Sequence, residues 1–598
     1  RFSNTERERE MKGSPKESSS SKKHFDSRFS FPTREESIEL RRTVLSTDEE
    51  ENASRTSVRT ILNSNLWDLQ TKELLDEVTV DYRKIKWIEN KLREIRGAIT
   101  NLNVRNPITS SSESAAYPLH SQRKVELEDF VKPSRVAVIG SFLLRSIAKP
   151  RVNIDLAVFI PSSTFIAKDL RDHRYTDKRN LYLKTMANAL RKEEPTLFHN
   201  MWYEALNGDT RRPVLCVGIS KDKKKTSSVA VRIVPALDPK DSPFDPKRLD
   251  LLNPRNNCRR RVVGEIQESQ PITPHYTNAV LEDLSLESNL RHLHARSKNS
   301  RTFSLACVLI KIWLRQRGLD SISDGVNGFM MSMLMSHLFQ DTQRVLSSQM
   351  GIFQIFRTFM TWLSKQSTLC VDMSSSSSSP TSSKFLNDMF DTVCMSPSFE
   401  ITHQETTTTK VLRLNIFARV SKYAFEELRY QAKRTLTMFA PGSDPMIGIQ
   451  NIFVRRADVL CRKDLVFWIK APKSPPSPPK NLDSMEELRR DSSKAAQRKL
   501  RLLENARARS IRTHNAVCDF GWKRVYADAV SDVITQGMGD RAYRVHATYD
   551  AAQTWSSKLE NDFRVCVQID LNPDNAWESV QKGPSAEDKI ASREFRSF

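Results

Sequence analysis

A glycine, a serine and an aspartate stand in an order that suits nucleotidyl or phosphoryl transfer. Gly140 and Ser141 follow a short apolar run, and Asp155 lies within a second one. Such chemistry needs a divalent metal, and Mg²⁺ prefers carboxylate oxygens that are held close together. A D-x-D pattern on a β-strand would place two carboxylates on one face, because side chains alternate along a strand. Asp155 therefore has the position of a first metal ligand.

The two other ligand positions lack a carboxylate. The residue two places after Asp155 is Ala157, and the candidate third strand carries Arg232. A guanidinium repels a metal ion instead of binding it. We therefore expect no metal, no cofactor and no catalysis, and we expect Asp155 to pair with a nearby arginine or to cap a turn. These five positions, called the vestigial site below, are Gly140, Ser141, Asp155, Ala157 and Arg232.

Short β-branched runs around the vestigial site predict an α/β unit. Residues 136–139 and 154–160 are expected strands, joined by the glycine-serine turn and a helical stretch. Residues 169–191 have the apolar spacing of a helix, and two more strands are expected at 214–219 and 228–234. The last two would form a hairpin around a lysine-rich loop. The predicted fold class is α/β plus α-helical, with a mixed sheet.

Helical patterns flank this unit. Apolar residues at steps of three to four over 62–102 predict an amphipathic helix packed on the α/β unit, with a free coiled coil as the alternative. Two core helices are expected at 303–314 and 329–338, on either side of a break that contains glycine. Residues 374–383 are mostly serine and are expected to form an inserted flexible loop.

The glycine-serine turn and the strand around Asp155 resemble the signature of the polymerase-β-like nucleotidyltransferase superfamily. That resemblance implies that Ala157 and Arg232 stand where catalytic carboxylates would be. The segment 307–318, followed by 325–334, resembles the substrate domain of poly(A) polymerases and oligoadenylate synthetases. The order of a transferase fold followed by a helical domain is therefore kept.

The block from residue 136 to about 470 resembles one family more closely, the Nrap family of nucleolar RNA-associated proteins. The motifs that carry the resemblance are IGSFLLR at 139–145, VNIDLAVFIP at 152–161, KDLRDHRY at 168–175, Lys178-Arg179 with Tyr182-Leu183, PRNN at 254–257, TPHY at 273–276 with Glu282-Asp283, and WLRQRG at 313–318. The resemblance implies two tandem transferase-like modules without catalytic residues, working in the small-subunit processome. It also implies that a second module begins after about residue 491 and is truncated in this chain.

Composition shifts along the chain predict the segment bounds. In order, we expect a disordered basic and serine-rich tail at 1–55, a helical segment and linker at 56–124, the degenerate nucleotidyltransferase-like domain at 125–255, a helical substrate-domain-like region at 256–370, a low-complexity insertion and linker at 371–410, a completing α/β segment at 411–470, a Pro-rich linker at 471–492, and a basic helix with the start of the second module at 493–598.

The overall charge favours a polyanionic partner. The chain has a formal charge of +22 and a pI near 9.6, which attracts nucleic acid. Its eight cysteines form no Cys-x-x-Cys pair, so we expect reduced thiols and no zinc site. No apolar run approaches the roughly 18 to 20 residues that span a bilayer. These features leave a cytosolic or a nuclear location open, and the family resemblance implies the nucleus and the nucleolus. Since residue 1 is not methionine, we expect a piece of a longer protein.

Basic residues are the candidate RNA contacts, through phosphate groups and without sequence-specific readout. The expected partners are pre-ribosomal RNA or a small nucleolar ribonucleoprotein (snoRNP) and other processome assembly proteins, with no membrane and no small-molecule substrate. The basic run 489–512 belongs to this set. The individual candidates are Lys221, Lys223, Lys224, Lys225, Arg255, Arg259, Arg260, Arg261, Arg315 and Arg317.

The predicted function is a non-catalytic nucleolar scaffold in small-subunit (18S) pre-ribosomal RNA processing and ribosome biogenesis. Two alternatives stay open. An active metal-dependent nucleotidyltransferase would use other carboxylates, such as Asp169, Asp172 or the pair Glu282-Asp283. A purely protein-docking scaffold would use the transferase-like surface to hold another assembly factor, with RNA binding incidental.

Overall fold

The structure is a computed structural model, and part of the chain is described in it. The described residues are 66–104, 127–221, 229–258, 272–373, 380–439, 445–454, 463–470, 519–549 and 564–577, apart from the single residues 128, 321, 341, 342, 344 and 520. They all belong to the unit Leu62–Phe598. The expected tail at 1–55, the Pro-rich linker at 471–492 and the basic run at 489–512 lie outside the described residues.

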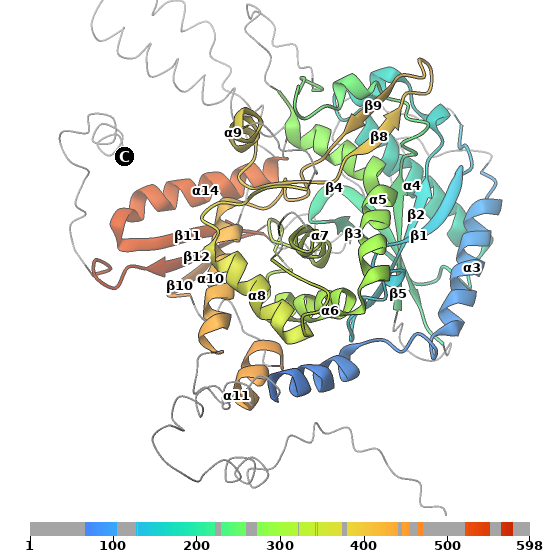
Figure 1. Cartoon of the computed structure of the whole chain (residues 1–598). Coiled ribbons are helices and arrows are strands. Elements are labelled where there is room, and N and C mark those ends of the chain that lie inside the picture. The colour runs from blue at the N-terminus through green and yellow to red at the C-terminus, as the bar shows by residue number, and fades with distance from the viewer. Residues whose placement is uncertain are drawn as a thin grey trace, which may run out of the picture. The chain divides into compact units, whose positions relative to one another are not determined.

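A five-stranded mixed sheet carries the vestigial site (Figure 1). The strand order is β1-β2-β5-β4-β3, in which β2 and β5 are parallel and the other neighbours are antiparallel. The predicted mixed sheet and the hairpin of its last two strands are confirmed. The strands are β1 (Arg135–Ile139), β2 (Val152–Phe159), β3 (Met201–Leu206), β4 (Asp209–Ile219) and β5 (Val229–Ala236).

Strand β3 was missing from the sequence prediction. It pairs with β4 through a two-residue turn, Asn207-Gly208, in which both residues have positive φ of 51° and 79°. An Asn-Gly turn of this kind matches the twist of a hairpin, so the signal was present in the sequence. Gly208 also needs to lack a side chain, because a Cβ would lie 2.6 Å from the Ser323 carbonyl oxygen.

The helix that follows β2 begins later than predicted. We expected it from residue 169, but α4 spans Arg174–Glu193. Asp172 and His173 both have φ of 59°, which a right-handed helix does not allow. The preceding residues Ala167–Leu170 form a separate 3₁₀ turn, in which the Asp169 carboxylate accepts the Ile166 backbone N–H.

The amphipathic pattern over 62–102 forms two helices rather than one. One covers residues 66–78 and the other, α3, covers Lys86–Asn101. The buried positions of α3 are Ile88, Leu92, Ile95 and Ile99, and this helix contacts β1 and α4. The predicted packing against the α/β unit is therefore confirmed.

The helical region is built on α6 and α7, as predicted. Trp313 of α6 is fully buried, and its indole N–H donates to Thr435 Oγ1 of α10 at 2.9 Å. Phe329, which we expected in the core, is 37% exposed. The helices of this region are α5 (Pro274–Asn299), α6 (Arg301–Gln316), α7 (Gly328–Leu338), α8 (Ile352–Lys365), α10 (Lys422–Thr437) and α11 (Pro445–Ile449).

The serine-rich insertion is more ordered than we expected. Residues 374–379 lie outside the described part, but residues 380–383 begin the helix α9, and Leu386 and Phe390 after them are buried. Short strands follow and precede it: β6 (Cys370–Asp372) pairs with β7 (Val393–Met395), and β8 (Phe399–Thr402) with β9 (Thr409–Leu412). The bounds of α9 are Pro380–Met389.

The segment 411–470, expected as a completing α/β segment, supplies strands to two sheets other than the five-stranded one. β9 pairs with β8, and β10 (Leu465–Lys470) pairs with β12 (Arg564–Leu571) in a three-stranded sheet of order β10-β12-β11. The third strand of that sheet is β11 (Ala542–Thr548), and α14 (Trp522–Met538) precedes β11 along the chain. β10 lies before residues 471–492 in the sequence, and it pairs with a strand that lies after them.

The cysteines agree with the expected reduced state. The six described cysteines are thiols, and Cys216, Cys307, Cys394 and Cys566 among them are buried. Among the described residues, no helix is both long enough and apolar enough to cross a membrane.

Candidate functional site

The vestigial site is occupied by an ion pair between neighbouring parallel strands. Asp155 of β2 lies beside Arg232 of β5 in the strand register. Arg232 donates from Nε at 2.7 Å and from Nη2 at 2.6 Å, both to Asp155 Oδ1. The expectation that Asp155 pairs with a nearby arginine is confirmed. The one carboxylate of the family pattern that remains is therefore bound to a fixed cation.

Further groups enclose Arg232. Cys216 of β4 is its cross-strand neighbour on the other side. The Asp155 carboxylate, followed by smaller contributions that include Cys216 and Glu204, raises the pKa of the guanidinium. Glu204 also accepts the Trp202 indole N–H at 2.8 Å. The charge of Arg232 is thus paired with a carboxylate of the neighbouring strand.

Gly140 allows the turn to approach Asp155 closely. Its φ is +74°, and a Cβ at this position would lie 2.6 Å from Asp155 Oδ2. Only glycine fits such a conformation without strain. Gly140, Ser141 and Phe142 form a short 3₁₀ helix between β1 and β2. The glycine of the motif therefore serves the packing of the strand end against Asp155.

Ala157 is buried in an apolar cluster. Its exposure is 0%, and it packs with Ile139, Phe159 and Ala236, while Leu286 of α5 lies against the same cluster. A carboxylate here would lie among apolar side chains, and burying an unpaired charge is costly. The position that the family pattern gives to a second metal ligand has become part of the core.

Three of the four alternative carboxylates, Asp169, Glu282 and Asp283, are engaged in ion pairs. Asp169 is fully buried and lies 2.9 Å from Arg174 Nε and 2.7 Å from Lys178 Nζ. Asp283 accepts from Arg179 Nε at 2.9 Å and from the Tyr175 hydroxyl at 2.8 Å. Within the described ranges, no group of three or more His, Cys, Asp or Glu side chains could hold a metal ion.

Arginine 212 gathers several of these acids. It contacts Glu282, Asp283 at 3.3 Å and Asp209 at 3.1 Å, and its side chain is 1% exposed. Arg419 contacts Asp209 as well. These ion pairs lie under α5, which carries Glu282 and Asp283, and they fasten that helix to β4. Glu282 and Asp283 therefore fasten α5 to the five-stranded sheet.

Lys311 is a charged residue near the vestigial site that our sequence reasoning did not single out. It lies on α6, and its Nζ donates to the Ser146 carbonyl at 2.7 Å and to Ser146 Oγ at 3.1 Å. Burial lowers the pKa of its ammonium group to about 8; Arg232 lowers this pKa slightly further, whereas Asp155 opposes the shift. The sequence could have pointed to Lys311 through its place in the segment 307–318, which carries a family resemblance. Lys311 joins the helical region to the loop after β1.

The candidate RNA contacts differ in accessibility. Lys221 and Arg255 are exposed. Arg315 is 25% exposed and donates to the carbonyls of Ala148 and Lys149. Arg317 is 1% exposed and donates to the Asn451 carbonyl at 3.1 Å, so our assignment of it to an RNA surface is corrected here. The candidates Lys223, Lys224, Lys225, Arg259, Arg260 and Arg261 lie outside the described residues.

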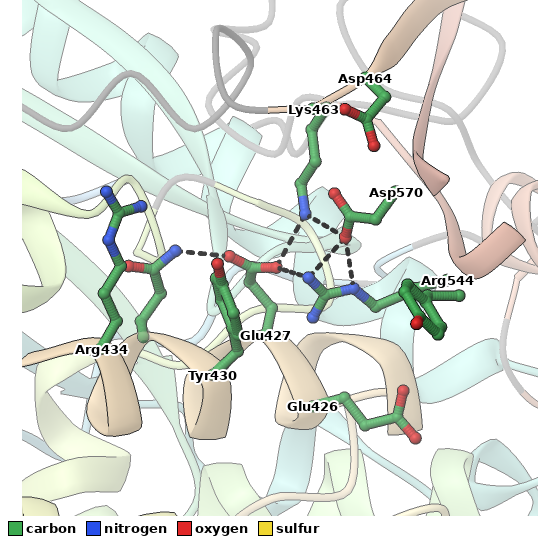
Figure 2. A pocket seen from close by; sticks show the side chains of 10 residues that line it. Glu426, Glu427, Tyr430, Arg434, Lys463, Asp464, Arg544 and Asp570 are labelled. Carbon is green, nitrogen blue, oxygen red and sulfur yellow. Dashed lines mark hydrogen bonds and ion pairs between the residues drawn. The ribbon is translucent and has the colours of Figure 1, made fainter. Parts of the chain in front are cut away.

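A pocket of about 490 Å³ lies between α10 and the three-stranded sheet. Figure 2 shows that two of its cations lie between acids: Lys463 is 3.0 Å from Glu427 and 2.9 Å from Asp570, and Arg544 is 2.9 Å and 2.6 Å from the same two residues. Tyr430 and Tyr543 are exposed in its wall. The ion pairs of Lys463 and Arg544 with Glu427 and Asp570 thus form a polar joint between α10 and the three-stranded sheet.

Two buried aspartates complete that joint. Asp324, before α7, is 2.8 Å from Arg524 Nη1 and 3.0 Å from His546 Nε2, and it also accepts from the Ser421 hydroxyl. Asp519 accepts the backbone N–H groups of His275 at 3.2 Å and Tyr276 at 2.8 Å, at the first turn of α5. Neither aspartate was singled out from the sequence, because its partners are far away along the chain.

Three consecutive family models match the chain. They are described as Nrap protein domain 1, over residues 93–299, Nrap protein PAP/OAS-like domain, over 302–454, and Nrap protein domain 3, over 491–598. Together they cover well over half of the sequence. The expected order of modules agrees with these matches.

Curated relatives are also similar over most of the chain. Nucleolar protein 6 of Xenopus laevis is 25% identical over 90% of this chain and 44% of the relative. The human and Xenopus tropicalis proteins of that name are each 28% identical over 67% of this chain and 34% of the relative. The chain thus spans less than half of the length of the curated relatives it matches.

Solved structures with a similar arrangement include two terminal uridylyl transferases. One is Cid1, an RNA terminal uridylyl transferase, at 10% identity and a TM-score of 0.37, covering 65% of this chain and 98% of that one. The other is a cytoplasmic RNA terminal U-transferase, also at 10% identity and a TM-score of 0.37, covering 66% of this chain and 98% of that one.

Proposed function

Because this chain belongs to the Nrap family, we propose that it is a non-catalytic nucleolar scaffold of ribosome biogenesis, acting in small-subunit (18S) pre-ribosomal RNA processing. It holds pre-ribosomal RNA, or a small nucleolar ribonucleoprotein, together with other assembly proteins of the small-subunit processome. The observation that carries the non-catalytic part is the ion pair between Asp155 and Arg232. The nucleolar setting is supported by relatives named Nucleolar protein 6 in frogs, mouse and human.

The loss of metal-dependent transfer has a physical basis in three positions. A metal ion would have to displace Arg232 from Asp155, bind beside a positive charge, and do so without a carboxylate at the buried position 157. The acids that an active enzyme could use instead, Asp169 and Asp283, are fully buried in ion pairs. Each of these features disfavours an active transferase.

Calorimetric titration with Mg²⁺ or Mn²⁺ and each nucleoside triphosphate tests the absence of catalysis. We expect no saturable, metal-dependent nucleotide binding by the whole chain. Asp155→Asn serves as the matched variant: it should lower stability by about 1–2 kcal/mol, between the values for exposed and buried ion pairs, and leave the titration unchanged. Saturable binding that Asp155→Asn abolishes would instead identify Asp155 as a surviving ligand.

RNA affinity over a salt series tests the scaffold. Phosphate contacts release counterions, so binding should weaken steeply as salt rises. The double variant Lys221→Glu/Arg255→Glu changes the two exposed described candidates. It should bind RNA more weakly than the unmodified chain at the same salt concentration. Lys84→Glu is the control, since this lysine is 83% exposed and lies outside the candidate set. The protein-docking scaffold would be favoured if the chain bound no RNA, or if the double variant and the control weakened RNA binding equally.

A further inference from the structure

Three of the family motifs meet at one place in the fold. His173 belongs to the motif at 168–175, Tyr276 ends the motif at 273–276, and Cys258 directly follows the motif at 254–257. The Cys258 sulfur lies 3.5 Å from His173 Nε2. The His173 ring packs edge-on against the Tyr276 ring, with 4.5 Å between the two centroids. A thiol, an imidazole and a phenol are thus gathered by residues outside the vestigial site.

The backbone holds the imidazole beside the sulfur. Asp172 and His173 both have φ of 59°, a conformation that is uncommon for residues with a side chain and that gathers at functional sites. The Asp172 N–H donates to the carbonyl of Asn257, the residue before Cys258, at 2.9 Å. Asn257 is fully buried, and its amide donates to Thr277 Oγ1 of α5 at 3.0 Å. The turn before α4, the loop that carries Cys258 and the first turn of α5 are therefore tied together.

The Tyr276 hydroxyl is buried and has no hydrogen-bond partner among the described residues; its residue is 1% exposed. Burial raises the pKa of this phenol well above its usual value, and Cys258 raises it further, so the hydroxyl and the sulfur are close enough to interact. A buried hydroxyl without a partner costs free energy. An oxygen atom on the Cys258 sulfur would provide the missing acceptor.

Three further charged groups act on this site: the carboxylates of Asp172 and Asp177 and the guanidinium of Arg211. The two carboxylates favour a protonated imidazole at His173, and the guanidinium favours a thiolate at Cys258. An imidazole at hydrogen-bond distance can accept the proton of a thiol, and the thiolate that remains is the nucleophile.

We propose that Cys258 is a peroxide-sensitive thiol, which hydrogen peroxide oxidises to a sulfenic acid while His173 accepts the thiol proton. The proton passes to His173 Nε2, and the sulfur attacks one peroxide oxygen. The S–O bond forms as the O–O bond breaks, so the sulfur is oxidised by two electrons and the peroxide is reduced. The hydroxide that leaves takes the proton from the imidazolium and becomes water. The Tyr276 hydroxyl donates to the oxygen that stays on the sulfur.

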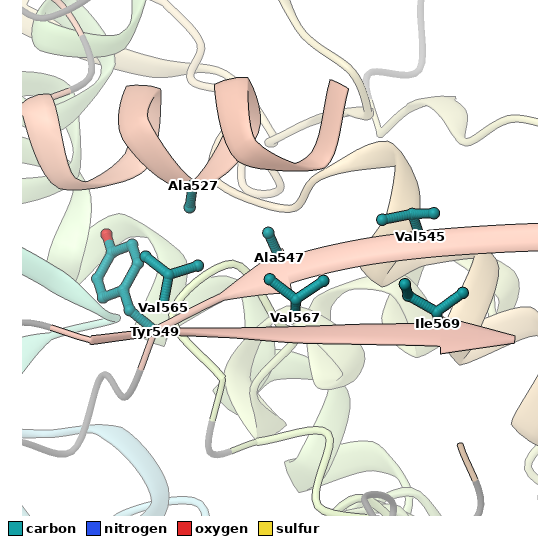
Figure 3. Packing of buried hydrophobic residues seen from close by; sticks show 7 residues of the cluster. All are labelled: Ala527, Val545, Ala547, Tyr549, Val565, Val567 and Ile569. Carbon is teal, nitrogen blue, oxygen red and sulfur yellow. The ribbon is translucent and has the colours of Figure 1, made fainter. Parts of the chain in front are cut away.

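Four of the described cysteines are buried, and burial raises the pKa of each thiol, which keeps it protonated and slow to react. They are Cys216, Cys307, Cys394 and Cys566. Figure 3 shows the two neighbours of Cys566, Val565 and Val567, in the apolar cluster beneath α14. Cys258 is half-buried, and Cys370 is exposed and serves as the reference thiol.

Alkylation of the whole reduced chain by iodoacetamide at pH 6.5 measures the thiolate, with peptide mass spectrometry to follow each cysteine. A free thiol is about one per cent thiolate at this pH. We expect Cys258 to react about tenfold faster than Cys370, because a gain of about a hundredfold in thiolate is partly offset by lower nucleophilicity. His173→Asn should remove this advantage, since asparagine tolerates a positive φ but is a poor proton acceptor. His199→Asn, at an exposed histidine, is the control and should leave the rate at Cys258 unchanged.

Hydrogen peroxide with dimedone, which traps sulfenic acids, measures the oxidation. We expect a dimedone adduct on Cys258 at low peroxide, before any adduct forms on Cys370. Tyr276→Phe should slow the oxidation of Cys258 about fivefold, as the loss of one hydrogen bond of about 1 kcal/mol would, and should leave its alkylation unchanged. A purely structural role of Tyr276 would change both rates together.

Three results overturn the proposal. The first is alkylation of Cys258 no faster than that of Cys370, which is also the result for a thiol that the reagent cannot reach. The second is an advantage of Cys258 that survives in His173→Asn. The third is the absence of a dimedone adduct on Cys258. Thermal unfolding checks that the variants fold; if His173→Asn does not, the two rates of the unmodified chain and Tyr276→Phe decide. None of these results bears on the proposed RNA scaffold, which is tested by RNA affinity and nucleotide titration.

Discussion

Asp324 and Arg524 form a buried ion pair of 2.8 Å, although they lie far apart in the sequence. Their side chains are 1% and 7% exposed. The pair joins the segment before α7 to α14, and the Asp324 carboxylate also contacts His546 of β11. Arg524 and His546, with the nearby hydroxyls, hold the pKa of Asp324 below its usual range although burial opposes this. One carboxylate of the helical region thus contacts both α14 and β11.

Removing the charge of Asp324 should strongly destabilise the protein. Asp324→Asn takes the buried carboxylate away from Arg524 and His546, and Arg524 keeps the more exposed Asp528 at 2.9 Å. We therefore expect the free energy of unfolding to fall by about 3 kcal/mol, at the lower end of the range for a broken buried pair. Urea denaturation measures the change. Asp320→Asn is the control, because Asp320 is 25% exposed and lies 4.0 Å from Arg315, so its loss should cost less than about 1 kcal/mol. Equal effects of the two changes would mean that the Asp324 pair is not special.

Glu427 should be less critical than Asp324. It contacts Lys463 and Arg544, but both cations also contact Asp570 and keep that partner in Glu427→Gln. We expect the free energy of unfolding to fall by about 1–2 kcal/mol in urea denaturation, less than in Asp324→Asn. Glu426→Gln, the adjacent and less buried position on α10, should change stability by less than about 0.5 kcal/mol. A loss at Glu427 as large as at Asp324 would contradict the shared arrangement.

Gly140 and Gly97 should respond oppositely to alanine. Gly140→Ala forces a positive φ on alanine and brings a Cβ within 2.6 Å of Asp155, so stability should fall by about 2 kcal/mol. Gly97 lies in α3, and a Cβ there would meet nothing within 4 Å. Gly97→Ala should therefore raise stability by about 0.5–1 kcal/mol, because alanine favours helix. Thermal unfolding of both variants checks the opposite signs; a neutral Gly140→Ala would show that the turn can relax.

Asp519 should make stability depend on pH in an unusual direction. Burial raises its pKa to about 6, although two backbone N–H groups and nearby arginines oppose the shift. The unfolded value is about 3.9, so between these values the folded protein holds the proton more tightly. Stability from this group is greatest at low pH and is lost as pH rises from about 4 to about 6.

Asp519→Asn removes this titration and provides the measurement. The stability of the variant minus that of the unmodified chain should rise by about 2–3 kcal/mol between pH 4 and 6.5, and stay level above that. Urea denaturation at a series of pH values gives the difference, in which the titration of all other groups cancels. A difference that does not change with pH would refute the ionisation of Asp519 in this range.

The vestigial site was predictable from the sequence because its residues sit in short motifs. The turn at Gly140, the strand around Asp155 and the substitutions Ala157 and Arg232 all follow from local patterns of strand and turn. Alternation along a strand relates Asp155 to position 157, and a shared sheet brings Arg232 near. The ion pair was therefore expected before the strand register was known.

Local patterns were less informative where conformation depends on single residues. The late start of α4 follows from the positive φ of Asp172 and His173, and neither residue interrupts the apolar spacing. Arg317 looked like a surface residue because it follows Arg315 in a basic run. Its burial against Asn451 comes from the packing of α6 on the segment after α11.

By itself, the sequence determined the alternation of strands and helices, the absence of carboxylates at two motif positions and the basic character of the chain. Only the tertiary structure decided that β10 joins β12, that Asp519 caps α5, and that Asp324 holds Arg524 and His546. The reason is physical: alternation and helical spacing act over a few residues, whereas an ion pair forms wherever the fold brings charges together in a dry place. Such partners have no fixed separation in sequence, so no local pattern announces them.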